Sequence, residues 1–120
     1  MMQIRTHKYA ELAYPLVESM QNVQFEAKYR TLALNLPTMI MQSGLAQTIG
    51  FLMAKSKEEH RSFLDHIATL LNFNTPEDFH KAILKSNITQ YQLLTRKSLD
   101  AASWLKRYTQ ALLNKEAVYD

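Results

Sequence analysis

The sequence predicts an all-α protein, a compact single-domain bundle of about six or seven helices that spans residues 1–120. Apolar residues recur every three or four positions along most of the chain, which is the spacing of one helix face. The 120 residues include only 2 Gly and 3 Pro, and 47% are hydrophobic, which favours a packed helical protein over a disordered one. No segment alternates apolar and polar residues as a half-buried strand does, and no Asn-Gly or Asp-Gly hairpin signal is present.

The N-terminal half is expected to form three helices. An apolar stripe covers residues 4–20, and the same spacing resumes over residues 25–43. Gly44 is expected to end the second helix, because glycine tolerates the left-handed conformation found at many helix ends. Residues 45–55 are apolar on most sides, so we expect them to form the most buried helix.

Two further helices begin at recognisable start signals. Residues 56–59, Ser-Lys-Glu-Glu, have the pattern of a capping box, which predicts a helix over residues 57–71. Thr75 followed by Pro76 combines a preferred N-cap with a residue that needs no amide donor in the first turn. The expected apolar face of the helix that starts there consists of Phe79, Ile83 and Leu84.

The C-terminal part of the chain predicts two more helical segments. Asn87 is a suitable N-cap for the first of them, and Thr95 is suited to cap a separate helix, the last and longest. Trp104 lies one position before Leu105 on the apolar stripe of that helix. We therefore expect Trp104 to be partly buried in the core.

Composition limits the cellular location, the metal chemistry and the kinds of partner expected for the protein. The chain contains no Cys, which excludes disulfides and thiolate metal sites and makes a cytoplasmic location the simplest expectation. The N-terminus lacks the apolar core of a secretory signal, and polar residues interrupt the most apolar stretch, so neither export nor a membrane span is expected. The formal charge of +3 and the pI near 9.2 permit a nucleic-acid partner without requiring one.

Enzymatic activity has little support in the sequence, and no cofactor or metal is expected. Glu77 and His80 form the one Glu-x-x-His pair, whereas di-iron helical bundles use two such pairs and further inward Glu residues. His7, His60 and His66 lack the spacing of metal ligands and are expected on polar helix faces. The chain has no Gly-x-Ser-x-Gly elbow, no Gly-rich phosphate loop and no Cys nucleophile.

Basic residues occur in doublets near expected helix ends or beside aromatic residues, where they can bind phosphates. The alternative interpretation is that they are solvated side chains on ordinary helix faces. It stays open at this point, because the sequence does not show whether the doublets converge. The doublets are Lys28 and Arg30, Lys55 and Lys57, Arg96 and Lys97, and Lys106 and Arg107.

Three segments carry a resemblance to a known family. Residues 104–108 read Trp-Leu-Lys-Arg-Tyr, and residues 36–52 contain Pro, then Gly-Leu, then an apolar run that ends in Phe-Leu before a nearby Lys. Residues 91–99 add to the similarity. Together these segments resemble the small subunit of type III-B (Cmr) CRISPR RNA-targeting effector complexes over about residues 29–111. The departures from the family pattern are Gly50, where Ala is more common, and Ser98, where an acidic residue is more common.

The resemblance implies a small all-helical protein without catalytic activity, which stacks beside a filament of larger subunits and lies along the guide RNA and its paired target RNA. Its implied partners in antiviral defence are other Cmr subunits, further copies of itself and both RNAs. A protein that must accept any guide and any target should contact phosphates rather than bases, with modest charge repeated over several copies. The candidate RNA-contact residues, in order of expectation, are Lys106 and Arg107, then Lys55 and Lys57, then Lys28 and Arg30.

Two other classes of function remain as alternatives. The first is a helical protein-interaction module or DNA-binding regulator unrelated to CRISPR, although no segment clearly supplies a recognition helix with several base-reading side chains. The second is a metal-dependent helical-bundle enzyme, which would copurify with iron or manganese.

Overall fold

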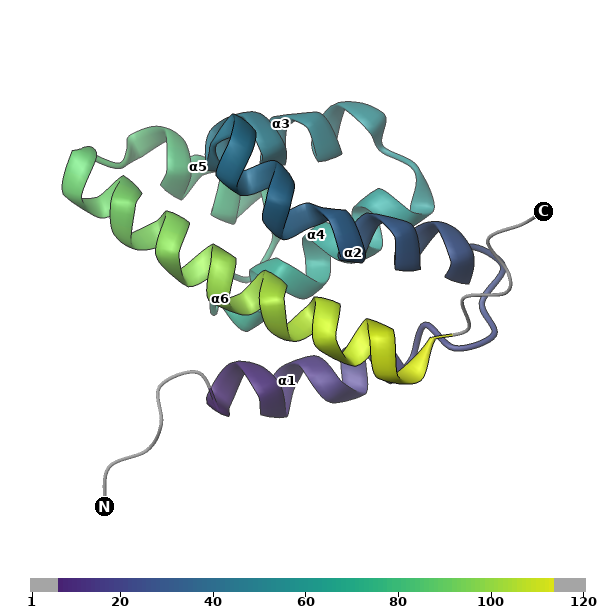
Figure 1. The fold of residues 1–120 in the computed structure, drawn as a ribbon. Helices are drawn as coiled ribbons and strands as arrows, with labels where there is room; N and C mark the ends of the chain where they lie inside the picture. The colour runs from purple at the N-terminus through teal and green to yellow at the C-terminus, as the bar shows by residue number, and fades with distance from the viewer. Residues whose placement is uncertain (1–6, 114–120) are drawn as a thin grey trace, which may run out of the picture.

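The computed structural model describes residues 7–113, which form six helices joined by turns (Figure 1). No strand occurs within this described range. The all-α bundle that the apolar spacing predicts is therefore confirmed. The helices are α1 (His7–Glu18), α2 (Glu26–Ser43), α3 (Leu45–Lys55), α4 (Glu58–Leu70), α5 (Pro76–Lys85) and α6 (Ile88–Leu112).

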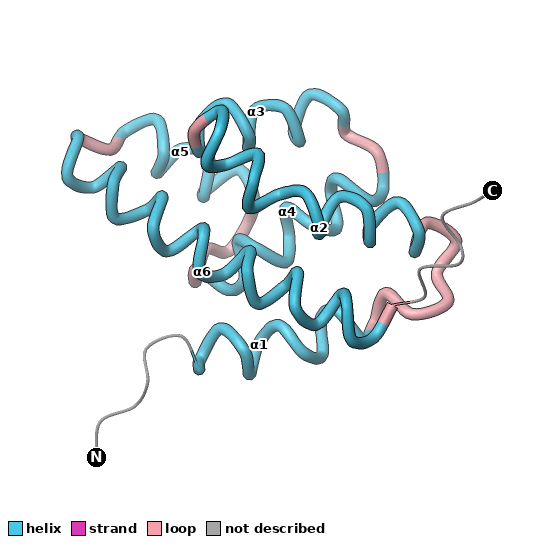
Figure 2. Tube along the Cα trace, viewed as in Figure 1, coloured by secondary structure: helices cyan, strands magenta, loops and turns pink. Residues whose placement is uncertain are grey.

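The longest helix, α6, runs along the length of the molecule between α1 and α2 (Figure 1). Behind it, α4 packs against all five other helices. Figure 2 shows that the connections are short, the longest of them being the segment that joins α1 to α2. The buried core therefore gathers around α4, with α1 at one edge of the bundle and α3 at the opposite edge.

The most buried helix is α4, so the expectation for residues 45–55 is wrong. Seven residues of α4 are buried, whereas α3 buries four. Because α3 lies at an edge of the bundle, Phe51 remains 41% exposed. Leu84 on α5 is likewise 66% exposed, against its expected inward position. An apolar side chain becomes buried only where a neighbouring helix covers it, and tertiary packing decides where those neighbours lie.

The expected stop signal at Gly44 is confirmed, but the expected capping box at Ser56 is wrong. Gly44 has a φ of 86°, and its N–H donates to the carbonyl of Ile40 at 2.9 Å. Ser56 has a φ of 58° and ends α3, and its N–H donates to the carbonyl of Leu52 at 3.2 Å. The N-cap position of α4 falls to Lys57, which makes no side-chain cap bond. Ser56 thus closes the preceding helix in a left-handed conformation and does not open the next one.

Two of the remaining expected caps are confirmed and one is wrong. Oγ1 of Thr75 accepts the N–H of Asp78 at 3.0 Å, and Oδ1 of Asn87 accepts the N–H of Gln90 at 2.8 Å. The side chain of Gln90 accepts the N–H of Asn87 in return, which completes a capping box. Thr95 does not start a helix, because α6 continues through it as one helix of 25 residues.

A buried hydrogen bond joins α2 to α4. Oη of Tyr29 and Nδ1 of His66 are 2.7 Å apart and share a hydrogen bond, and both residues are buried. Burial lowers the pKa of His66 to about 4 and raises the pKa of Tyr29. The imidazole is therefore neutral near pH 7, with one ring nitrogen that donates and one that accepts a hydrogen bond. The expectation that His66 lies on a polar face is wrong, since the side of α4 that carries it faces α2.

Candidate functional site

The structure distributes the candidate basic residues over different surfaces. Lys106 and Arg107 belong to α6, where Arg107 is exposed and Lys106 is half-buried. Lys28, Lys55 and Lys57 are exposed and come from the first turn of α2, the end of α3 and the α3–α4 turn. Lys28 and Lys57 line one concavity of about 450 Å³.

Arg30 does not join Lys28 on one surface. Two positions along a helix correspond to about 200° around its axis, so these two side chains leave α2 in nearly opposite directions. Arg30 is half-buried, and its Nε atom is buried without a hydrogen-bond partner among residues 7–113. Lys28 and Arg30 therefore lie on opposite sides of α2 and cannot form one basic patch.

The outer face of α6 includes Arg96, Ser103, Arg107 and Gln110, all exposed, with the half-buried Asp100 on the same side and Lys106 at the edge. Arg96 and Arg107 are eleven positions apart, which is about three helical turns, so they lie on the same side at a separation of about 16 Å along the axis. This alignment follows from the regular helical backbone of α6 between the two residues. The helix carries four cations and one carboxylate, the half-buried Asp100. The outer face of α6 is therefore polar and predominantly positive.

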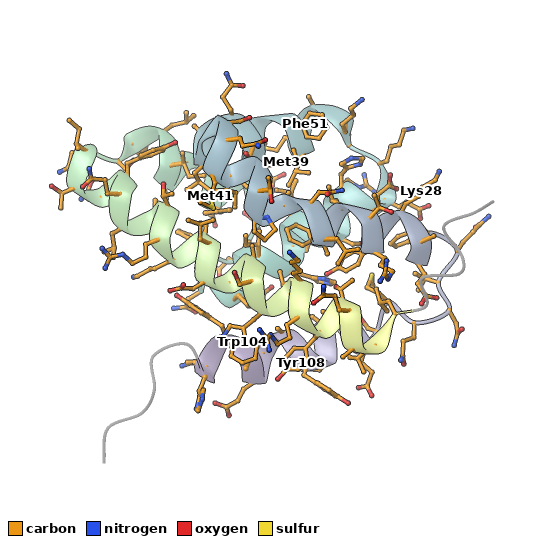
Figure 3. All side chains as sticks on the ribbon, viewed as in Figure 1. Lys28, Met39, Met41, Phe51, Trp104 and Tyr108 are labelled. Atoms are coloured by element: carbon orange, nitrogen blue, oxygen red, sulfur yellow. The ribbon has the colours of Figure 1, made fainter. Side chains whose placement is uncertain are left out.

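A groove of about 790 Å³ opens between α2 and the α3–α4 region. Figure 3 shows Met39 and Phe51 on this side of the molecule, with Lys28 toward the N-terminal end of α2. Unlike the outer face of α6, the groove exposes apolar atoms to solvent. No local sequence pattern predicts this groove, because its walls come from separate helices. The apolar members of its lining are Val23, Ala27, Leu32, Met39 and Phe51.

Four exposed cations surround this groove and the adjoining concavity, and we call them the basic rim: Lys28, Lys55, Lys57 and Arg61. Nζ of Lys55 lies over the ring of Phe51, 5.6 Å from its centroid, in a cation–π geometry. Arg61 lines the concavity together with Lys57. Arg61 was not among the expected residues, since it stands alone in the sequence and forms no doublet.

Carboxylates also lie at the groove, but the buried ones have partners within the chain. Glu26 accepts the N–H of Asn22 at 2.9 Å, and Oε2 of Glu59 lies 3.5 Å from Nδ1 of His60. Both carboxylate residues are buried. Glu58 is the exposed carboxylate that lines the adjoining concavity. The exposed charge around the groove is therefore mainly positive.

His60 reports on the electrostatics of the groove. Its pKa is lowered, first by burial of the ring and further by the positive charges of Lys55 and Lys57, while the nearby Glu59 opposes the shift. The imidazole is therefore mainly neutral at pH 7, and its 3.5 Å contact with Glu59 is a polar contact and not an ion pair.

The described part of the chain shows neither a metal-ligand cluster nor a membrane-spanning helix. Glu77 is exposed and His80 is half-buried on α5, and residues 7–113 contain no group of three or more His, Cys, Asp or Glu arranged to hold a metal ion. None of the helices in that range combines the length and the apolarity needed to cross a bilayer.

Trp104 is half-buried and packs against the core, as expected. Its ring lies 5.6 Å from that of Tyr108, and Tyr108 meets Tyr14 of α1 edge-on at 5.2 Å. Figure 3 shows Trp104 and Tyr108 together on the side of α6 that adjoins α1. Trp104 thus helps to attach α1 to α6.

These features define a small all-α protein with two basic surfaces, one polar and one with an apolar floor. The chain matches the family described as CRISPR-associated protein (Cas_Cmr5) over residues 5–112. It belongs to this family, so the resemblance found in the sequence is confirmed and extends through α1.

Two comparisons with individual proteins agree with this assignment. The chain is 32% identical over 114 residues to "CRISPR system Cmr subunit Cmr5" of Thermus thermophilus, covering 95% of this chain and 100% of that protein. The X-ray crystal structure of a CRISPR-associated Cmr5 family protein from Thermus thermophilus superposes with a TM-score of 0.88 at 32% identity, covering 93% of this chain and 100% of the other.

Proposed function

We propose that this chain is a non-catalytic small subunit of a type III-B (Cmr) CRISPR ribonucleoprotein effector complex. It acts in the cytoplasm in antiviral defence, as one helical domain over residues 1–120, and contacts the backbones of guide RNA and target RNA. The relative from Thermus thermophilus is named a Cmr subunit, which supports the same assembly for this chain. The observation that carries the RNA contact is the outer face of α6.

The outer face of α6 has the chemistry that a sequence-independent RNA contact requires. Phosphate contacts provide affinity without reading bases, and guanidinium groups bind phosphate oxygens with two N–H donors. Arg96 and Arg107 present such groups from one side of a rigid helix, and Lys106 adds a third cation beside them. A single copy with so few contacts binds weakly, and several copies along one RNA add their contacts.

The four remaining candidates, Lys28, Arg30, Lys55 and Lys57, lie outside the outer face of α6. Their contact with RNA stays a prediction. Lys28, Lys55 and Lys57 are exposed on the basic rim, whereas the half-buried Arg30 is the least accessible of the four. Other Cmr subunits and further copies of this chain are the proposed protein partners.

The test measures binding of labelled RNAs of unrelated sequence across a salt series, with the protein alone and with the assembled complex. Lys106→Ala/Arg107→Ala is expected to reduce the slope of log affinity against log salt by about 2, because each lost phosphate contact removes about one released counterion. The matched control is Lys81→Ala/Lys85→Ala, which removes two exposed cations from α5. The control should leave the slope unchanged.

Equal losses in both double variants would show a general effect of net charge and would count against the outer face of α6. Tighter binding of duplex DNA than of RNA would favour the alternative of a DNA-binding regulator. Assembly into the complex without any effect of the α6 variant on RNA binding would leave the chain as a protein-interaction module.

A further inference from the structure

The corner between α5 and α6 projects from one end of the bundle. Figure 1 places this corner opposite the segment that joins α1 to α2, and Figure 2 shows that a short turn forms its outermost part. No residue from 84 to 97 is buried, so the end of α5 and the first turns of α6 extend beyond the core. The corner therefore presents much of its surface to solvent.

Two large apolar side chains lie at the tip of this corner. Leu84 is 66% exposed near the end of α5, and Ile88 is 78% exposed as the first residue of α6. They are four positions apart in the sequence, so their Cα atoms lie within about 14 Å of each other. Among the large apolar side chains of residues 7–113, only Met41 is comparably exposed. Covering this pair with a partner would be favourable.

The charges around the tip are positive. Lys81 and Lys85 are exposed and share one side of α5 with Leu84, because residues three and four positions apart are neighbours on a helix. No Asp or Glu occurs between residues 79 and 99, and α3, which packs on α5, contains none either. The carboxylates of α5 are in its first turn, at the opposite end of the helix. We call Lys81, Leu84, Lys85 and Ile88 the corner patch, which combines exposed apolar atoms with positive charge.

Local hydrogen bonds fix the backbone of the corner patch. Oγ of Ser86 donates to the carbonyl of Ile83 at 2.6 Å, and the Asn87 capping box holds the start of α6. These bonds are formed within the turn itself and need no contact from the rest of the bundle. The backbone of the corner patch therefore loses little conformational freedom on binding, which favours affinity.

We propose that the corner patch docks in an apolar pocket bordered by carboxylates on a different protein, a larger subunit of the complex. Leu84 and Ile88 enter the pocket, and Lys81 and Lys85 pair with the carboxylates at its edge. This inference rests on the proposed function, in which the chain assembles with other Cmr subunits. It leaves the outer face of α6 free for RNA.

A different protein fits the corner patch better than RNA or a second copy of this chain does. Phosphates would pair with the two lysines but would leave Leu84 and Ile88 without an apolar contact. The groove of a second copy has an apolar lining, but the basic rim around it would repel Lys81 and Lys85. A pocket with carboxylates at its edge satisfies both the apolar and the charged members of the patch.

The first test measures binding of this chain to the complex assembled from its other subunits and immobilised for surface plasmon resonance. Leu84→Gln/Ile88→Gln, the corner variant, is expected to bind at least about tenfold more weakly than the parent chain, because both side chains lose their apolar contacts. Circular dichroism of the corner variant should match that of the parent, since both residues are exposed.

The matched control is Met41→Gln/Leu93→Gln, which also changes two exposed apolar side chains, 76% and 47% exposed. Met41 belongs to α2 and lies away from the α5–α6 corner (Figure 3). Leu93 leaves α6 about 140° around the axis from Ile88. Equal affinities of the corner variant and the parent chain, or an equal loss in the control, would overturn the proposal.

Charge reversal tests the sign of the pocket. Lys81→Glu/Lys85→Glu should slow association with the immobilised complex, and its difference from the parent chain should shrink as the salt concentration rises. Faster association of this variant would indicate a basic pocket and would refute the proposed complementarity. The milder Lys81→Ala/Lys85→Ala change acts mainly on the rate of encounter, so it still permits assembly and keeps its place as the control for RNA binding.

Other occupants of the corner patch would give different results. Loss of self-association by the corner variant in sedimentation velocity would identify a second copy as the occupant. A reduced salt slope of RNA binding by the free corner variant would identify RNA. Either result would count against a different protein subunit.

The same measurements separate this inference from the proposed function. If the parent chain binds the complex and the corner variant binds equally well, the corner patch fails and the assembly stands. If the corner variant loses binding while RNA binding does not depend on the outer face of α6, the RNA contact fails and the corner patch stands. If the parent chain does not bind the complex, both the proposed assembly and the corner patch fail.

Discussion

The outer face of α6 and the groove between α2 and α3–α4 carry similar cations in different surroundings. On α6, Arg96, Lys106 and Arg107 stand among polar side chains on one uninterrupted helix. Around the groove, Lys28 and Lys55 border exposed apolar atoms, and carboxylates lie nearby. The first surface offers only polar and charged groups, whereas the second combines positive charge with exposed apolar atoms.

The difference shows that a basic doublet does not reveal its partner. In the sequence, the doublet at positions 55 and 57 looks as well suited to phosphates as the one at 106 and 107. What distinguishes the two doublets is the polarity of the side chains around the charges. At the groove, many of those side chains belong to other helices. A partner is therefore better inferred from a surface as a whole than from its charged residues.

The largest expected effect is on the wall of the groove, which rests on buried residues. Tyr29→Ala removes a fully buried side chain and leaves Nδ1 of His66 without its hydrogen-bond partner, so we expect the free energy of unfolding to fall by about 3–5 kcal/mol. Urea denaturation measures this change in the free energy of unfolding. Arg107→Ala, on the exposed outer face of α6, should stay within about 0.5 kcal/mol of the parent protein. A comparable loss for Arg107→Ala would mean that the α6 face is structural.

Lowering the pH should reduce the free energy of unfolding, because His66 is buried in its neutral form beneath the groove wall formed by α2. Above pH 6.5 the imidazole is neutral in both the folded and the unfolded chain, so its contribution to stability is fully present. As the pH falls from 6.5 to about 4, the unfolded chain binds a proton that the folded chain does not. We expect this group to remove about 3 kcal/mol of stability over that range and nothing further below it.

The control for this pH effect is Tyr29→Phe/His66→Leu, which replaces both partners of the buried hydrogen bond by apolar groups. Denaturation of parent and variant at several pH values isolates the contribution of His66, since the other titrating groups are common to both. The same loss of stability in both proteins between pH 6.5 and 4 would contradict the assignment to His66.

A smaller effect concerns the alignment of Arg96 with Arg107. If both contact phosphates, Arg96→Ala and Arg107→Ala should each reduce the salt slope of RNA binding by about 1, with little dependence on RNA sequence. Arg61→Ala on the basic rim should leave the slope unchanged. Equal slopes for all three variants would abolish the distinction between the two surfaces.

The smallest expected effect is a gain in stability at Gly50, next to Phe51 in the groove wall. A Cβ at Gly50 meets no atom within 4 Å, so Gly50→Ala should stabilise α3 by about 0.5–1 kcal/mol, seen as a higher midpoint in thermal unfolding. Gly44→Ala is the contrasting control, because its φ of 86° and ψ of 159° are strained for any L-residue and should cost about 1–3 kcal/mol. Stabilisation by both changes would show that the α2–α3 corner is less constrained than its geometry indicates.

Much of the fold was predictable because its signals are local. Gly44, Thr75 and Asn87 mark helix boundaries through conformations and hydrogen bonds that involve only the next few residues. The errors at Ser56 and Thr95 have one cause. Both residues are good caps in isolation, but one closes the preceding helix and the other lies within a helix that Asn87 had already started.

The candidate site was predictable only in part. Lys106 and Arg107 were found through a family motif, and the structure adds Arg96, which is exposed on the same side of α6 as Arg107. Arg61 and Phe51 were missed, because a lone cation and one aromatic residue on an apolar helix carry no distinctive local pattern. Both belong to the site because residues of other helices lie beside them and complete the groove and the adjoining concavity.

The sequence by itself determined the all-α class, most helix boundaries and the membership in the Cmr5 family, since these depend on apolar spacing, caps and short motifs. Tertiary structure alone decided that α4 and not α3 is enclosed, that His66 is buried against Tyr29, and that the basic doublets divide between two surfaces. The physical reason is that burial, pKa and surface composition depend on which helices lie beside a residue, and a residue's neighbours along the chain do not specify them.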